Sequence, residues 1–215
     1  RLFYTRTTDG SGVARLNINL IPGDYILTAI NPVNGEQHSN NVKVLTVLSD
    51  GHDVTKYYRN DSVYSVKVLD GMGNPLANAD VSFNINGIFY TRQTNESGYA
   101  NLNLRLQPGE YIVTADYKGL KYSNIVNILP VLFANDTVSD TNESNFKVKL
   151  IDGQGNPYEN QTIEFNINGV KYTNITDSQG IANLFVVLPD GEYIVTSSYD
   201  EFSISNKITI KNEAQ

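Results

Sequence analysis

Apolar and polar residues alternate one by one over several short stretches of the chain. The clearest stretches are residues 80–86 and 100–106, in which every second residue is apolar. A period of two indicates a β-strand with one buried face, because successive side chains of a strand point to opposite sides. We find no stretch of useful length with the helical period, so the pattern predicts an all-β protein.

Turn signals separate these stretches. Asn86-Gly87 and Asn168-Gly169 lie between two strand-like runs, which is the strongest short-range signal for a β-hairpin. The pattern Asp-Gly-x-Gly-Asn-Pro, at residues 70–75 and 152–157, predicts a turn that ends the preceding strand. Short strands with such closely spaced turns are typical of a β-sandwich. In one complete unit we expect strands over residues 63–69, 80–86, 88–93, 100–106, 111–117 and 121–131.

The chain repeats itself. Phe3-Tyr4-Thr5-Arg6 returns as Phe89-Tyr90-Thr91-Arg92, and Lys171-Tyr172-Thr173-Asn174 occupies the same place in a third copy. Other landmarks recur in the same register, which indicates a tandem array of one structural unit. We expect domains over residues 1–48, 60–132 and 143–211, joined by polar linkers over 49–60 and 133–142 of about ten residues each, a length that permits bending.

The first of these domains is expected to be incomplete. Its sequence begins at a position equivalent to Gly87, so the first two strands of the unit have no counterpart in it. One interpretation, which we favour, is a segment of a longer array. The other is completion by strands of a neighbouring copy, which would make the chain a filament subunit.

Composition and charge narrow the function classes. The chain of 215 residues has no Cys, which excludes disulfides, thiolate metal sites and Cys nucleophiles, and its net charge of −7 argues against binding nucleic acid. Its two histidines, His38 and His52, have no carboxylate-rich helix beside them. We find no Gly-rich phosphate loop, nucleophile elbow or distinctive carboxylate pair, so we expect no enzyme. No apolar run is long enough to span a bilayer.

The repeat resembles the immunoglobulin-like repeats of adhesin-like surface proteins from methanogenic archaea. The resemblance rests on the Asp-Gly-x-Gly-Asn-Pro turn and on residues 78–87, 97–104 and 108–115, and it covers nearly the whole chain outside the linkers. Bacterial invasin-type and collagen-adhesin B-type repeats share the general layout. The resemblance implies tandem immunoglobulin-like antiparallel β-sandwiches, an extracellular location at the cell surface, and a role in adhesion or surface structure.

Tyrosines occupy recurrent places. Tyr25, Tyr111 and Tyr193 each follow a Gly-Asp or Gly-Glu pair, a placement that resembles a tyrosine corner, in which the hydroxyl ties down an arch between sheets. The alternative is a tyrosine in a half-buried strand. The pair Tyr57-Tyr58 lies in an expected linker, and core packing does not obviously explain it, so it is the first cluster to test for contacts with a partner or a neighbouring domain.

Asparagine sequons predict covalent glycans on a secreted protein. An acceptor asparagine must be exposed, and several of the sequons lie in expected linkers or turns. The candidates are Asn60, Asn95, Asn135, Asn142, Asn160 and Asn174.

An internal isopeptide bond is a further hypothesis, implied by the likeness to collagen-adhesin B-type repeats. These join a Lys of the first strand to an Asn of the last strand, assisted by an acidic residue. The candidates are Lys67, Asn124 and Glu110 in one domain, and Lys149, Asn206 and Glu192 in the next. The strand alternation argues against the bond, because it places both lysines toward solvent.

Calcium has little support in the sequence. Asp9-Gly10-Ser11-Gly12 and Asp177-Ser178-Gln179-Gly180 supply oxygens but have neither EF-hand nor RTX spacing. We expect each aspartate to cap its own turn, and we expect no metal or other cofactor apart from glycans.

Taken together, the residues and the resemblance predict an extracellular stalk or fibre of tandem repeats, whose partners are neighbouring copies or further repeats. An alternative is a module that itself binds a cell-surface glycan or protein through its loops and exposed tyrosines. A third is an accessory domain of a surface enzyme.

Overall fold

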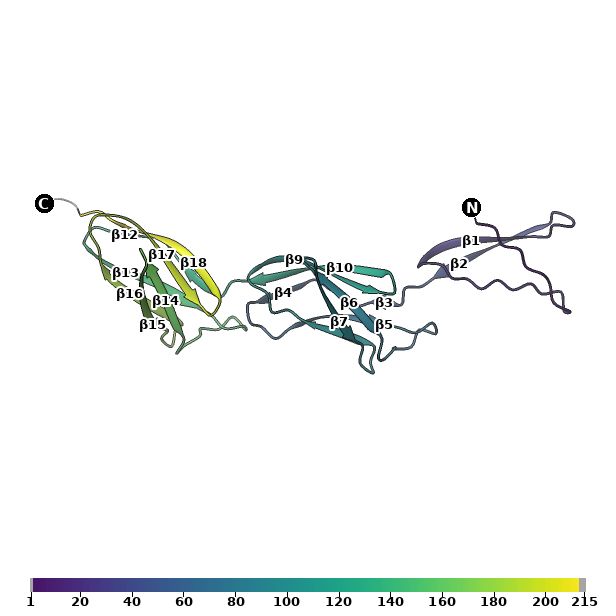
Figure 1. Ribbon diagram of the computed structural model, residues 1–215, viewed down its shortest axis with the longest axis horizontal. Helices are drawn as coiled ribbons and strands as arrows, with labels where there is room; N and C mark the ends of the chain where they lie inside the picture. Colours follow the sequence, from purple (N-terminus) through teal and green to yellow (C-terminus); the bar gives the residue numbers. More distant parts are fainter. Residues whose placement is uncertain (1, 213–215) are drawn as a thin grey trace.

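The structure is a computed structural model that describes residues 2–212, and within them it contains strands and turns only. Arg1, at which the first expected domain begins, lies outside the described residues. The described chain forms three parts that follow one another along the long axis (Figure 1). We call them the N-terminal module (residues 2–44), the middle sandwich (residues 48–129) and the C-terminal sandwich (residues 132–210).

The middle sandwich consists of two facing sheets. One sheet has the strand order β3-β5-β8 and the other β4-β10-β9-β6-β7, which is the arrangement of an immunoglobulin-like β-sandwich. Apolar residues at alternate positions face inward from both sheets, and the rings of Tyr64 and Phe83 meet edge to face at 5.9 Å in the core. The strands are β3 (Leu48–Ser49), β4 (Val54–Tyr57), β5 (Val63–Val68), β6 (Asp80–Ile85), β7 (Ile88–Gln93), β8 (Tyr99–Asn103), β9 (Gly109–Tyr117) and β10 (Leu120–Leu129).

The C-terminal sandwich repeats this architecture. Its sheets have the orders β11-β13-β16 and β12-β18-β17-β14-β15. Phe146 and Phe165 stand in its core where Tyr64 and Phe83 stand in the middle sandwich, with ring centroids 6.2 Å apart. The strands are β11 (Leu132–Ala134), β12 (Thr137–Ser139), β13 (Glu143–Leu150), β14 (Thr162–Ile167), β15 (Val170–Ile175), β16 (Ile181–Val187), β17 (Gly191–Tyr199) and β18 (Phe202–Ile210).

The two segments expected to be linkers belong to the sandwiches, so this prediction was wrong. β3 and β4 start the middle sandwich in one sheet and then cross to the other, where β4 pairs in parallel with β10. β11 and β12 do the same, and β12 pairs in parallel with β18. The sandwiches therefore begin at residues 48 and 132, and only residues 45–47 and 130–131 connect successive parts. Connectors this short restrict bending far more than the expected linkers would.

The N-terminal module contains a single hairpin, formed by β1 (Gly23–Ile30) and β2 (Gln37–Val44). The hairpin corresponds to β9 and β10, which pair with each other. Residues 2–7 and 13–17 match β7 and β8, whose partners in the middle sandwich are β6 and β5. The described part of the module has no counterpart of β5 or β6, so these segments form no strand, and no residue from 2 to 47 is buried.

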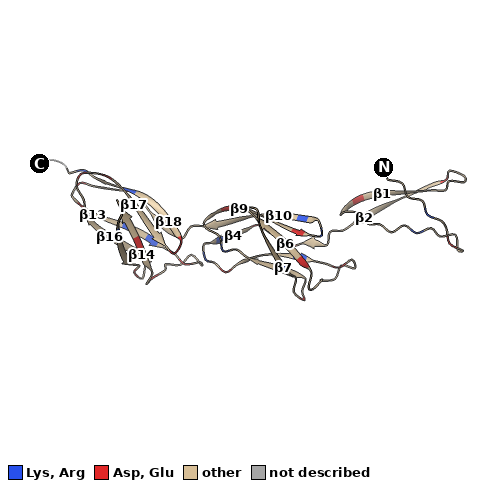
Figure 2. Cartoon of the chain, in the orientation of Figure 1, with Lys and Arg blue, Asp and Glu red and all other residues tan. Residues whose placement is uncertain are grey.

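Charged residues are spread among the strands and loops of all three parts (Figure 2). No helix of the described residues is long and apolar enough to cross a membrane.

Candidate functional site at the joint between the sandwiches

Residues 57–60, which we call the corner loop, leave the end of β4 and contact the C-terminal sandwich. The side-chain amide of Asn60 donates a hydrogen bond of 2.7 Å to the carbonyl oxygen of Gly153. The guanidinium of Arg59 pairs with the carboxylate of Asp200, in the turn between β17 and β18. The ring of Tyr58 lies 6.2 Å from the ring of Phe202. An amide, an ion pair and two aromatic rings therefore hold the sandwiches together.

The side chain of a buried lysine, Lys56, supports the corner loop through hydrogen bonds. Lys56 is only 7% exposed, and its Nζ donates hydrogen bonds to the carbonyl oxygens of Asn60 at 2.7 Å and Ser62 at 2.8 Å. Burial lowers the pKa of Lys56, because the charged ammonium loses its hydration. The side-chain oxygen of Asn60 also accepts the backbone N–H of Ser62 at 2.8 Å. Contacts within the middle sandwich therefore hold the corner loop in place.

The receiving side of the joint is the turn of residues 152–157. Asp152 closes this turn, since its Oδ1 accepts the backbone N–H groups of Gln154 and Asn156 at 2.9 Å each. A Cβ atom on Gly153 would lie 3.0 Å from the carbonyl oxygen of Arg59 and 3.0 Å from the backbone nitrogen of Asn60. The corner loop therefore occupies the space that a side chain at position 153 would need.

Charge supports the same contact. The hydrogen bond that the Arg59 guanidinium donates to the carboxylate of Asp200 raises the pKa of Arg59. The Arg59 guanidinium also lies 5.0 Å from the centre of the Tyr58 ring, within the range of a cation–π contact. The two charged side chains remain 43% and 38% exposed, so their ion pair contributes only about 0.2–1 kcal/mol.

Sequence reasoning found part of this site. It singled out Tyr57-Tyr58 as the first cluster to test for contacts with a partner or a neighbouring domain, and the structure places both tyrosines against the C-terminal sandwich. It missed Lys56, Arg59 and Asp200. The one sequence feature that pointed to this contact was Gly153 of the Asp-Gly-x-Gly-Asn-Pro pattern. The backbone at position 153 has no positive φ, so it does not itself require glycine.

The tyrosine-corner candidates share one geometry. Each hydroxyl donates to the backbone carbonyl four residues upstream: Tyr25 to Ile21 at 2.7 Å, Tyr111 to Gln107 at 2.8 Å, and Tyr193 to Pro189 at 2.9 Å. This is the hydrogen bond that characterises a tyrosine corner.

The six sequon asparagines fall into two groups. Two of them use the nitrogen that would carry a glycan: Asn60 donates to Gly153, and Asn174 donates to the carbonyl of Asn183 at 2.7 Å. Asn95 is exposed, and its side-chain oxygen accepts the backbone N–H groups of Ser97 and Tyr99. The remaining candidates are exposed: Asn135, Asn142 and Asn160.

The isopeptide candidates have other partners. Lys67 places its Nζ 5.3 Å from the centre of the Tyr99 ring, and Asn124 accepts the hydroxyl of Tyr64 at 2.6 Å. Lys149 is exposed on β13, while Asn206 donates to the carboxylate of Asp136 at 3.2 Å.

Both acidic candidates, Glu110 and Glu192, are exposed. Among the described residues, neither lysine forms a hydrogen bond with its candidate asparagine.

Instead, these asparagines bind aspartates that precede β4 and β12. The Oδ1 of Asp53 accepts the backbone N–H of Ile125 at 2.9 Å and the side chain of Asn124 at 3.1 Å. Asp136 binds the backbone of Lys207 and the side chain of Asn206 in the same way. These hydrogen bonds, chiefly those from the backbone, lower the pKa of both aspartates. The contact fixes the crossing of the first strand between the sheets.

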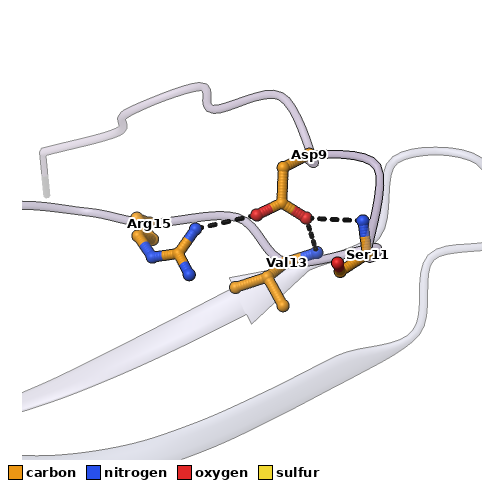
Figure 3. Close-up of polar contacts among 4 residues, drawn as sticks. All are labelled: Asp9, Ser11, Val13 and Arg15. Carbon is orange, nitrogen blue, oxygen red and sulfur yellow. Dashed lines mark hydrogen bonds and ion pairs between the residues drawn. The ribbon is translucent and has the colours of Figure 1, made fainter.

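The Asp-containing turns considered for calcium are closed by their own backbone. Asp9 accepts the N–H groups of Ser11 at 2.8 Å and Val13 at 3.0 Å, and its other oxygen accepts Arg15 at 2.8 Å (Figure 3). The backbone hydrogen bond from Val13 is the largest cause of the lowered pKa of Asp9. Asp177 binds two backbone N–H groups in the equivalent turn. Within residues 2–212, no three His, Asp or Glu side chains form a group that could hold a metal ion.

No protein-family model matches the chain, and no curated protein matches it either. Among solved structures, invasin, a bacterial integrin-binding protein, is 18% identical with a TM-score of 0.36; the match covers 77% of this chain and only 38% of invasin. A chimeric titin Z1Z2 tandem is 14% identical, with coverages of 77% and 97% and a TM-score of 0.34.

A Ca²⁺-stabilised adhesin with which an Antarctic bacterium binds ice is 15% identical, with coverages of 89% and 57% and a TM-score of 0.25. At these identities and TM-scores the likenesses carry no inference about ligand, partner or location. The assignment of immunoglobulin-like sandwiches rests on the sheet topology of the chain itself.

Proposed function

We propose that this chain is part of an extracellular stalk or fibre, in which tandem immunoglobulin-like sandwiches extend an adhesive surface away from a cell. The observation that supports the proposal most directly is the joint between the sandwiches. Residues 130–131 leave little freedom, and the corner loop then contacts the receiving turn, Asp200 and Phe202. A joint with this many specific contacts favours one orientation, which suits a structure that must hold its length.

The resemblance of residues 78–87, 97–104 and 108–115 to archaeal adhesin-like repeats supports the same proposal. The rival function, binding of a glycan or protein by the module itself, loses its strongest candidate surface, because Tyr57 and Tyr58 lie in the joint. The partners that we propose are further repeats or neighbouring copies. Glycans on the exposed sequons Asn95, Asn135, Asn142 and Asn160 would suit a surface location.

Two measurements test this function. Antibody labelling of intact cells should detect the protein outside the cell, and an intracellular signal that appears only after lysis would refute the location. Small-angle X-ray scattering of the purified chain should fit a single arrangement of the two sandwiches. A curve that requires a broad ensemble of orientations would refute the rigid stalk.

A further inference from the structure

The middle sandwich has its own copy of the receiving turn, at its opposite end from the joint. Asp70 closes residues 70–75 as Asp152 closes residues 152–157, with Oδ1 accepting the N–H groups of Met72 and Asn74 at 2.9 Å each. Met72 is 87% exposed, and a Cβ atom on Gly71 would meet nothing within 4 Å. Among the described residues, nothing covers this turn.

Gly71 is not required by its own backbone. Its φ lies outside the left-handed region, and the same is true of Gly153. At position 153 the reason for glycine is external, because the corner loop occupies the space of a side chain. The same requirement would explain Gly71 if a corner loop also docked at residues 70–75.

The connector ahead of the middle sandwich would place a module for such docking. In the existing joint, the carbonyl of Val131 accepts the N–H of Ile151 at 2.9 Å, just before the receiving turn. The carbonyl of Val47 accepts the N–H of Leu69 at 2.8 Å in the equivalent place. The last paired residue of the preceding hairpin is Ile128 in the existing joint and Val44 ahead of the middle sandwich. The same number of residues separates each of them from the carbonyl that it precedes. A preceding module is therefore held at the same spacing.

The two receiving surfaces differ in charge. Asp200 follows Tyr199 in the turn between β17 and β18, and the residue that follows Tyr117 in the equivalent turn is Lys118. The Nζ of Lys118 lies 5.4 Å from the centre of the Tyr117 ring, and among the described residues no carboxylate pairs with it. A corner loop with an arginine, like that of the middle sandwich, would place two positive charges together here.

We propose that residues 70–75 and Lys118 form a receiving surface for the corner loop of a preceding immunoglobulin-like module of the same repeat, one with an acidic residue where the middle sandwich has Arg59. The charge at this position then decides which module can precede which. The inference rests on the proposed stalk, since it extends the existing joint to a second one. An exposed ion pair changes such an equilibrium by about 1.4- to fivefold, and an apposed like-charge pair by a similar factor in the opposite direction.

The test is the full chain with residues 48–131 duplicated in tandem directly after Val131. The first copy then presents Arg59 to Lys118 of the second copy across the same connector. Three variants complete a cycle: Arg59→Glu in the first copy, Lys118→Asp in the second copy, and both together. The chain has no Cys, so Thr91→Cys in each copy provides two unique sites for spin labels on exposed strands. Pulsed electron–electron double resonance then gives the distribution of distances between the two labels.

We expect narrower distance distributions for the two single variants than for the unchanged chain and the double variant. Gly71→Val in the second copy should broaden the Arg59→Glu chain again. Four equal distributions would overturn the proposal, whether all narrow or all broad.

Labels at Thr91→Cys and Thr173→Cys in the natural chain report on the existing joint. A broad distribution there would refute the stalk itself. A narrow distribution there, beside four equal tandem chains, would overturn the proposed receiving surface and leave the stalk standing.

Discussion

Substitution of Gly153 by valine should open the joint between the sandwiches. Its Cβ would lie 3.0 Å from two backbone atoms of the corner loop, the oxygen of Arg59 and the nitrogen of Asn60. Backbone atoms cannot rotate aside as a side chain does, and hydrogen bonds from the Nζ of Lys56 hold the loop in place. The corner loop and the receiving turn must therefore move apart, and we expect this to weaken the contacts of the joint together.

The magnitude follows from those contacts. The hydrogen bond from Asn60 to Gly153 contributes about 0.5–1.5 kcal/mol. The aromatic contact between Tyr58 and Phe202 contributes about the same, and the exposed ion pair of Arg59 with Asp200 about 0.2–1 kcal/mol. Their loss, about 1–4 kcal/mol in all, would lower the ratio of closed to open joints roughly tenfold to a thousandfold.

Gly71→Val is the matched control. It lies in the same Asp-Gly-x-Gly-Asn-Pro turn, so any intrinsic cost of valine in this turn is common to both variants, but a Cβ there meets no atom within 4 Å. Small-angle scattering and the width of the distance distribution between labels at positions 91 and 173 should change for Gly153→Val and stay as in the unsubstituted chain for Gly71→Val. Equal behaviour of the two variants would refute the view that the corner loop holds the joint.

Three further predictions concern the sandwiches themselves. Tyr111→Phe and Tyr193→Phe each remove the hydroxyl of a tyrosine corner and should lower the free energy of unfolding by about 1 kcal/mol in urea titrations; an unchanged midpoint would deny the hydroxyl a structural role. Gly51→Ala would place a Cβ 2.7 Å from the hydroxyl of Tyr64, so it should destabilise the middle sandwich by about 1–3 kcal/mol, and Tyr64→Phe added to it should recover part of that loss; a double variant no more stable than the single one would contradict this packing. The lowered pKa of Asp136 means that the stabilisation from its carboxylate is present above the ordinary carboxyl pKa of about 4 and is lost as the pH falls below that value and through the lowered pKa. Asp136→Asn should therefore flatten the fall in melting temperature on acidification below about pH 4, and an unchanged slope would count against this contact.

The sequence by itself determined the local structure of each repeat. Alternation identified strands such as β6 and β8, because a half-buried strand needs an apolar residue at every second position. The Asn86-Gly87 turn was identifiable because both residues adopt positive φ, which few other pairs tolerate. The placement of Tyr111 was equally local, since its hydroxyl reaches a carbonyl only four residues upstream. Internal repetition then carried each of these assignments from one sandwich to the other.

Only the tertiary structure showed that the expected linkers are strands. β4 and β12 lie at the edge of a sheet and pair through backbone hydrogen bonds, so their side chains need no apolar period. It also showed that residues 2–7 form no strand, although they closely match β7, because a strand exists only beside a partner.

The joint depended on tertiary structure for the same reason. Arg59 and Asp200 lie far apart in the sequence, and Lys56 is fixed by carbonyl groups that any residue could supply. Contacts of this kind leave no spacing or periodicity in the chain, and they arise only when the folded sandwiches meet.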